Sequence, residues 1–261
     1  MSPLQRSRNS LNVVINRAYR DVRFPEMTLL PAPGVSLAFA AVVIAAIAVC
    51  FWMFDAPTAR AARALRDDKS TITAFFSATT DIGTSTWILV LTAIVALFIS
   101  ASNWADLDRQ TVIRRAKLHG KLNFVFFTVG ITGILASLIK NTIGRARPKH
   151  LEELGPYAFD FARFDAPFAS FPSGHATTFG ALCMGLFLLL PRAWAPLIAC
   201  FAILGATSRV MVGAHYPSDV IAGLTFGGVS TLLAARWLAQ RGTLFAHTNG
   251  VFPSLKKAGR V

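Results

Sequence analysis

The sequence predicts an all-α integral membrane protein, a bundle of six transmembrane helices. Hydrophobic residues make up 54% of the 261 residues, charged residues only 15%, and the mean hydropathy is +0.51, which is too apolar for an ordinary soluble domain. The apolar residues also form long uninterrupted runs instead of the alternating patterns of soluble helices and strands. Because a helix needs about 20 such residues to cross the hydrocarbon core, these runs predict membrane spans, and the bilayer is an expected partner.

Six runs are candidates for the spans. Residues 34–54 carry no charge. This run begins too far from the N-terminus and is too long for the apolar region of a secretory signal peptide, so we expect it to be retained as the first span. The other candidates are residues 85–102, 122–143, 175–190, 196–213 and 219–238. The sequence has no internal repeat, and it predicts one membrane domain, residues 34–238, between two flexible tails, residues 1–33 and 239–261.

The basic residues of the loops indicate the orientation of the bundle. The formal net charge is +13, but in a membrane protein the distribution of Lys and Arg between the two faces is more informative, and no nucleic acid is expected as a partner. With six spans, most of the 26 basic residues lie on the face of the two termini. The positive-inside rule then places both tails in the cytoplasm, with the protein in the cytoplasmic (inner) membrane. The opposite face carries the smaller group: Arg60, Arg63, Arg66, Lys69, Lys140, Arg145, Arg147, Lys149, Arg163 and Arg209.

Two connecting segments on the extracytoplasmic face have unusual compositions. In residues 56–69, three arginines at three-residue spacing predict a short amphipathic helix, either lying in the membrane interface or serving as a solvated connector. Residues 144–171 hold five phenylalanines among charged residues. That mixture is compatible with a lid over a lipid site and equally with aromatic anchoring of a loop at the headgroup level.

The first of three polar motifs is KNTIGRARP, at the extracytoplasmic end of the third span. Lys140 and Arg147 are separated by six residues and followed by Pro148, so two cations lie near one span end. Each has a simpler interpretation, because a lysine near a span end often extends its amine to the interface and an Arg-Pro pair often only ends a helix.

The second motif, FPSGHATTFG, immediately precedes the fourth span. The N-terminus of a helix offers unpaired N–H groups and the positive end of its dipole. Gly174 allows the backbone to approach an anion, and Ser173 adds a hydroxyl donor. This arrangement is typical of an oxyanion cradle, although Ser173 could simply cap the helix, with His175 in its first turn.

The third motif, SRVMVGAHYPSD, joins the fifth and sixth spans. Arg209 supplies a planar, permanently charged donor that suits phosphate oxygens. A carboxylate at Asp219 can hold one ring N–H of His215 and leave the other nitrogen free to attack. A structural His–Asp pair between two spans is the alternative.

Alternating topology carries all three motifs to one membrane face, because the third span ends there, the fourth begins there and the fifth-to-sixth connection lies there. Three cations, a helix N-terminus and two histidines around one point form an anion site, and phosphate is the anion whose transfer needs them most. Outside these motifs, no His, Cys or carboxylate cluster has metal-ligand spacing. We therefore expect no metal and no other cofactor.

Together the three motifs resemble those of the type 2 phosphatidic acid phosphatase superfamily. The matching positions are Lys140, Arg147, Pro148, Pro172, Ser173, Gly174, His175, Ser208, Arg209, His215 and Asp219. The resemblance implies that Lys140, Arg147, Arg209, Ser173 and the Gly174 backbone bind the phosphoryl oxygens. It further implies that His215 is the nucleophile, that Asp219 orients it and that His175 protonates the leaving oxygen.

The expected function is metal-independent hydrolysis of an envelope lipid's phosphomonoester or pyrophosphate, through a phosphohistidine, at the extracytoplasmic face. Lipid A is the first choice of substrate, with undecaprenyl pyrophosphate, phosphatidylglycerol phosphate and phosphatidate as alternatives. A lipid phosphotransferase on the same scaffold remains open. Intact motifs argue against a non-catalytic transporter or scaffold, and six apolar spans argue against a soluble haloperoxidase relative. The sequence does not indicate an oligomeric state.

Overall fold

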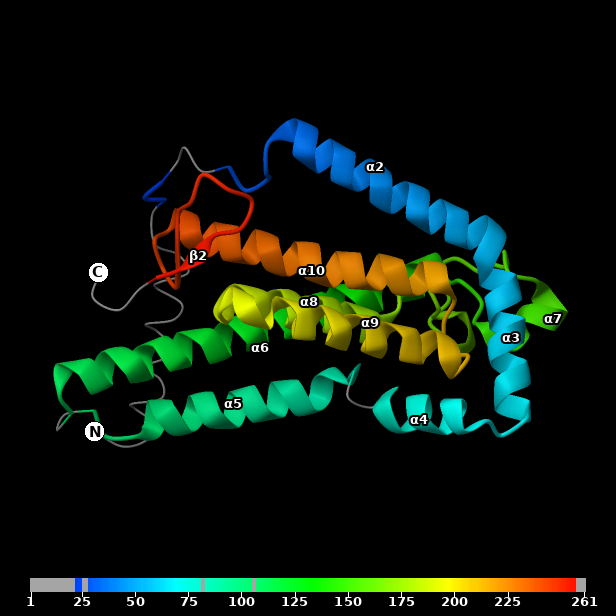
Figure 1. Ribbon diagram of the computed structural model, residues 1–261, viewed down its shortest axis with the longest axis horizontal. Coiled ribbons are helices and arrows are strands. Elements are labelled where there is room, and N and C mark those ends of the chain that lie inside the picture. The colour runs from blue at the N-terminus through cyan, green and yellow to red at the C-terminus, as the bar shows by residue number, and fades with distance from the viewer. Residues whose placement is uncertain (1–21, 25–27, 81–82, 105–106, 257–261) are drawn as a thin grey trace.

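Helices form nearly all of the secondary structure in the computed structural model, which describes residues 22–24, 28–80, 83–104 and 107–256 (Figure 1). The longer elements are α2 (Pro33–Val49), the π-helical turn η1 (Cys50–Phe54), α3 (Asp55–Asp67), α4 (Thr71–Thr80), α5 (Ser85–Ala101), α6 (Arg109–Ile143), α8 (Gly174–Leu189), α9 (Ala195–Met211) and α10 (Pro217–Gln240). Short turns η3 (Pro148–His150), α7 (Leu151–Leu154), η4 (Ala166–Phe168) and η5 (Arg192–Trp194) and strands β1 (Phe245–Ala246) and β2 (Ser254–Leu255) complete the described fold.

The apolar runs of the sequence correspond to these helices. Within the described residues, five helical stretches are long and apolar enough to cross a membrane, and Gly174–Leu189 is a sixth, shorter apolar helix. One boundary differs clearly: α6 begins at Arg109 rather than near residue 122, because the Asp108 carboxylate caps it by accepting the N–H groups of Gln110 and Thr111 at 2.9 and 3.1 Å. Helix α4 was not predicted, and α6 includes most of the segment between the predicted second and third spans.

Close packing of α8 against α10 fixes the central pair of the bundle. A β-carbon on Gly180 would collide with the backbone carbonyl of Leu224, and one on Gly227 would collide with the carbonyl of Thr177. Only glycine permits helix backbones to approach so closely. This contact holds the N-terminus of α8 in register with that of α10, and both carry polar motifs.

Helix α3 crosses the end of the bundle at which α8 and α10 begin (Figure 1). The chain bends between α2 and α3 at the π-helical turn η1, a feature that is frequent at functional sites. Ala59 and Ala62 pack inward from α3, while Arg60 pairs with Glu152 at 3.2 Å. The amphipathic helix predicted for residues 56–69 is therefore present, and it covers the end of the bundle.

The C-terminal segment packs against the opposite end of the bundle. Strands β1 and β2 pair antiparallel, and the fully buried ring of Phe245 lies 4.9 Å, centroid to centroid, from that of Phe124. The N–H groups of Arg23 and Phe24 donate to the carbonyl oxygen of Gln240 at 2.9 and 3.1 Å. Residues 239–256 are thus folded, in contrast to the flexible tail predicted for residues 239–261, whose last part, like most of the predicted tail 1–33, lies outside the described residues.

Candidate active site at the helix ends

Helix ends bring the three sequence motifs to one end of the bundle (Figure 1). Lys140 lies in the last turn of α6, and Arg147 follows after the left-handed Gly144 that ends this helix. Gly174 and His175 begin α8. Arg209 lies in the last turn of α9, while His215 and Asp219 flank the start of α10. Lys140, Arg147, Arg209 and His215 lie close enough to His175 to interact with it electrostatically, so these five side chains share one site.

His215 is held by the backbone and not only by its predicted partner. Its Nδ1 lies 2.9 Å from the carbonyl oxygen of Ser170 and 3.6 Å from Oδ2 of Asp219. A carbonyl oxygen can only accept, so Nδ1 carries the proton and Nε2 keeps the lone pair that a nucleophile requires. Burial lowers the pKa of His215 below its ordinary value, against the opposing effect of Asp219. The ring is therefore neutral near neutral pH.

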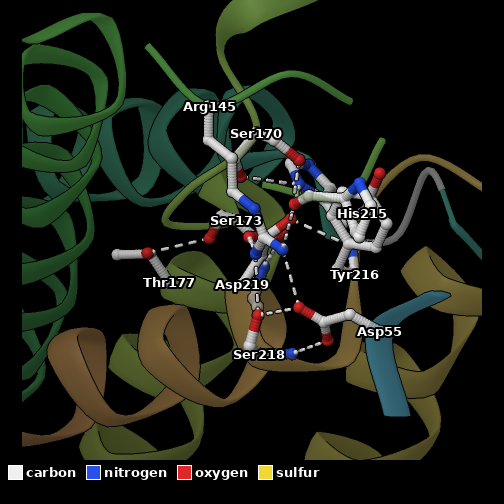
Figure 2. A network of polar contacts seen from close by, with 11 residues as sticks. Asp55, Arg145, Ser170, Ser173, Thr177, His215, Tyr216, Ser218 and Asp219 are labelled. Carbon is white, nitrogen blue, oxygen red and sulfur yellow. Dashed lines mark hydrogen bonds and ion pairs between the residues drawn. The ribbon is translucent and has the colours of Figure 1, made fainter. Parts of the chain in front are cut away.

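Asp219 is completely buried, and both of its oxygens accept hydrogen bonds. Oδ2 accepts from the Ser170 hydroxyl at 2.6 Å and from the Tyr216 N–H at 2.9 Å, while Oδ1 accepts from Nη1 of Arg145 at 2.5 Å. These bonds fix the carboxylate beside the His215 ring. Ser170 contacts both members of the pair, since its carbonyl holds His215 and its hydroxyl holds Asp219 (Figure 2).

Four residues around this pair were not predicted from the sequence: Asp55, Arg145, Ser170 and Ser218. Arg145 bridges Asp219 and Asp55, and Ser218 lies between the same groups (Figure 2). Two signals were available. Asp55 directly follows an uncharged apolar run, and an acid at a span end indicates a function or a buried partner. Arg145 is a third cation inside the first motif, between Lys140 and Arg147.

The predicted phosphate-binding residues surround the start of α8. Ser173 caps that helix, its hydroxyl accepting the Ala176 N–H at 3.4 Å, and its side chain is fully buried. Arg209 is mostly buried and donates from Nη1 to the Thr80 hydroxyl, which brings the unpredicted α4 into the site. Three cations beside a helix N-terminus strongly favour a multiply charged anion.

A groove leads from this site along the bundle. Its volume is about 830 Å³, and α5, α6 and α8 line it. Lys140, Gly174 and His175 lie at one end, and Phe126 and Phe127 lie several helical turns away along α6. The walls between them are mostly apolar or small, including Gly130 and Gly133. An apolar chain attached to a phosphate could therefore occupy the groove while its phosphate reaches the cations.

Known proteins are similar to this chain in sequence. Residues 121–243 match the family model of the PAP2 superfamily. Lipid A 1-phosphatase of Rhizobium etli is 38% identical over 229 residues, covering 84% of this chain and 94% of that protein, and lipid A 1-phosphatase of Rhizobium johnstonii is 38% identical over 222 residues, covering 84% and 87%.

A solved structure shares the fold. The crystal structure of a transmembrane PAP2 type phosphatidylglycerolphosphate phosphatase from Bacillus subtilis superposes with a TM-score of 0.50 at 21% identity, over 76% of this chain and 90% of that one. The motifs, the family model and the two relatives that align over most of their length agree. This chain belongs to the PAP2 superfamily.

Proposed function

We propose that this chain is a lipid phosphatase that removes the 1-phosphate of lipid A. The observation that carries this proposal is the 38% identity to two lipid A 1-phosphatases, aligned over 94% and 87% of their lengths. Two features of the site support it. The cations at the helix ends suit a phosphate, and the apolar groove that starts beside Lys140 and His175 suits the acyl chains of a lipid.

The proposed reaction begins when the phosphate group binds among Lys140, Arg147 and Arg209, with the hydroxyl of Ser173 and the backbone of Gly174 at the start of α8. These donors hold the oxygens on which negative charge gathers during phosphoryl transfer. Nε2 of His215 then attacks phosphorus, a P–N bond forms and the bond from phosphorus to the lipid oxygen breaks. His175 gives a proton to that oxygen as it leaves.

Water completes the reaction by attacking the phosphorus of the phosphohistidine, and the P–N bond breaks to release inorganic phosphate. His175 takes the proton from this water and so returns to its starting state. The Ser170 carbonyl accepts from Nδ1–H throughout, with the Asp219 carboxylate beside it. Because Nδ1 keeps its proton while Nε2 is phosphorylated, the imidazole gains a positive charge. A negatively charged neighbour therefore favours the intermediate.

We further propose that α2, α4–α5, α6, α8, α9 and α10 form six spans of the inner membrane. Helix α8, with 16 residues, is the shortest of these spans, and the loop of residues 144–171 precedes it in the chain. In this orientation both termini are cytoplasmic and the site faces the periplasm. With six spans, the sequence assigns more Lys and Arg to the face of the two termini than to the face of the site, and the positive-inside rule then supports this orientation.

The deciding experiment supplies purified protein with lipid A, undecaprenyl pyrophosphate, phosphatidylglycerol phosphate or phosphatidate in separate mixed micelles. Released phosphate is measured, and mass spectrometry locates the phosphate that lipid A has lost. We expect the highest kcat/KM on lipid A, loss of the 1-phosphate and no release by His215→Ala. A higher kcat/KM on another lipid would reject lipid A as the substrate, and recovery of the phosphate on an added acceptor lipid would identify a phosphotransferase.

A further inference from the structure

Arg145 differs from the other cations at this end of the bundle because it cannot reach a phosphate. Its side chain is fully buried. Nη1 donates to the Ser218 hydroxyl at 2.7 Å and to Oδ1 of Asp219 at 2.5 Å, and Nη2 donates to Oδ2 of Asp55 at 2.7 Å and to the Pro156 carbonyl at 3.2 Å. All four Nη hydrogens therefore have acceptors within the protein, and none is available to a substrate.

Aromatic rings fix the plane of this guanidinium. Its central carbon lies 4.3 Å from the ring centroid of Tyr216 and 4.8 Å from that of Phe51. Tyr216 stands at the start of α10, and Phe51 stands in the turn η1 between α2 and α3. Contacts of this kind attract a cation to the face of the ring. Arg145 is thus clamped between the first long helix and the helix that carries Asp219.

Asp55 completes the clamp from the side of α3. It is fully buried, its Oδ1 accepts the backbone N–H of Ser218 at 3.0 Å, and its Oδ2 accepts from the Ser218 hydroxyl as well as from Arg145. The N–H of Ser218 belongs to the first turn of α10, whose N–H groups have no partner within the helix. Asp55 therefore ties the start of α3 to the start of α10 at Ser218, the residue that precedes Asp219 (Figure 2).

The charges of this network explain why two carboxylates share one arginine. Asp55, Asp219 and Arg145 together carry a net charge of −1 in their ordinary ionisation states. Burying an uncompensated charge is costly. When His215 becomes positively charged during phosphoryl transfer, its charge brings the buried group to neutrality. The arrangement is therefore complementary to the charged intermediate and not to the resting enzyme.

We propose that Asp55 and Arg145 are positioning residues for the phosphoryl transfer: Arg145 fixes the Asp219 carboxylate, and Asp55 supplies the second negative charge that favours a positively charged His215. This inference rests on the proposed role of His215 as the nucleophile. In this proposal Asp55 and Arg145 act on His215 through Asp219, and the charged or titratable groups that interact with His215 directly include Asp219 from α10, Arg147 after α6, Arg209 from α9 and His175 from α8. They remain unchanged in the test.

Variants that change the charge of the network by one unit in either direction test the proposal. In Asp55→Asn the network is neutral, so a positively charged His215 is less favourable. We expect phosphohistidine formation to slow about tenfold, as with other outer partners of a reacting group. We also expect the acid limb of the kcat/KM profile, where activity is lost as His215 becomes protonated, to move to lower pH by about 0.5–1 unit. In Arg145→Gln the network carries −2, and the acid limb should move to higher pH.

The double variant Asp55→Asn/Arg145→Gln restores the net charge of −1 without the ion pair. Its acid limb should return to within about 0.3 unit of the wild-type position, although its turnover stays low because Asp219 is no longer fixed. Arg145→Gln leaves two buried carboxylates without a cation and can fail to fold. In that case the comparison of the double variant with Asp55→Asn still tests the proposal. Substrate ionisation contributes equally to every profile, so the differences in acid-limb pH between variants report the charge of the network.

Asp160→Asn and Arg163→Gln are the matched controls, because this pair, at 2.8 Å, lies on the exposed part of the same loop region. Both should keep the wild-type profile. An acid limb that does not move in Asp55→Asn, whatever its activity, would reduce Asp55 to a packing role and overturn the inference. Shifts in the same direction for Asp55→Asn and Arg145→Gln would also overturn it, because charge could not be the cause.

A second measurement follows the protonation of His215 without turnover. Diethyl pyrocarbonate reacts with neutral imidazole, and cleavage after Arg209 and Arg236 yields a peptide in which His215 is the only histidine. The pH at half-maximal labelling should shift between variants as the acid limbs do. If wild-type protein releases no lipid phosphate, the proposed function fails while this labelling still tests the network; if labelling does not shift, the inference fails while the function stands.

Discussion

Nδ1 of His215 donates its hydrogen to the carbonyl oxygen of Ser170 across 2.9 Å. The tautomer of the proposed nucleophile is therefore set by the backbone, and Asp219, at 3.6 Å from the same nitrogen, contributes mainly its negative charge. Ser170 links the two because its hydroxyl donates to Asp219 at 2.6 Å. The relative importance of orientation and charge can be measured at these positions.

Asp219→Asn should reduce kcat far more than Ser170→Ala. The first change removes the charge that favours an imidazolium and leaves Arg145 without one carboxylate, so we expect a loss of about 10³-fold. The second keeps the backbone carbonyl that orients His215 and removes one hydrogen bond to Asp219, so the loss should be about tenfold or less. Steady-state kcat on one lipid substrate measures both. Equal losses would show that the carboxylate acts only through its position.

Replacing each histidine should separate the nucleophile from the general acid. His215→Ala should abolish turnover of every substrate because the covalent step is lost. His175→Ala should lose about 10²- to 10⁴-fold on a lipid phosphomonoester, whose alkoxide leaves poorly without a proton, and much less on an aryl phosphate. The measurement is the ratio of mutant to wild-type kcat/KM on the two substrates. Equal losses for His175→Ala, or selective rescue of His215→Ala, would reverse the two roles.

Filling the groove should change the preference for chain length. A β-carbon at Gly133 meets no atom within 4 Å, so Gly133→Trp extends into the space between α5 and α6. Excluding two methylene groups at about 0.8 kcal/mol each should lower the ratio of kcat/KM for a long-chain over a short-chain lipid phosphate about tenfold. Leu138→Trp, at an exposed position of the same helix outside the groove, is the control. An unchanged ratio in Gly133→Trp would place the acyl chains elsewhere.

Activity should persist in excess chelator. In the proposed site the charge of a bound phosphate is offset by Lys140, Arg147 and Arg209, which would take the role that a divalent cation has in metal-dependent phosphatases. The assay compares phosphate release before and after dialysis against EDTA. A loss of turnover that a divalent ion restores would contradict this prediction.

Cysteine labelling should place the site outside the cytoplasm. In a variant without Cys50, Cys183 and Cys200, Glu153→Cys lies on an exposed turn beside the site, since the Glu153 side chain is 77% exposed. It should react with an impermeant maleimide in intact spheroplasts. Gln110→Cys, exposed at the start of α6, should react only after permeabilisation. The reverse pattern would place the site and its substrates on the cytoplasmic side.

The sequence by itself determined the helical membrane architecture and predicted the residues of the anion site. Apolar runs long enough to cross a bilayer have few alternatives, because an unpaired backbone is too costly in lipid, and the runs correspond to α2 with η1, α5, α6, α8, α9 and α10. The motif spacing identified His215, Asp219 and the cations because alternating spans bring those segments to one face. These inferences required only local composition and the direction of the chain.

Only the tertiary structure decided which groups hold the proposed nucleophile. Asp55 and Arg145 are 90 positions apart in the sequence and meet across a buried 2.7 Å ion pair, and no periodicity indicates such a contact. Ser170 orients His215 through a carbonyl oxygen that every residue type possesses, so its sequence identity carries no signal. Pairings of this kind depend on where the bend at η1 and the glycine contacts between α8 and α10 place the helix ends, because packing over long sequence separations fixes those positions.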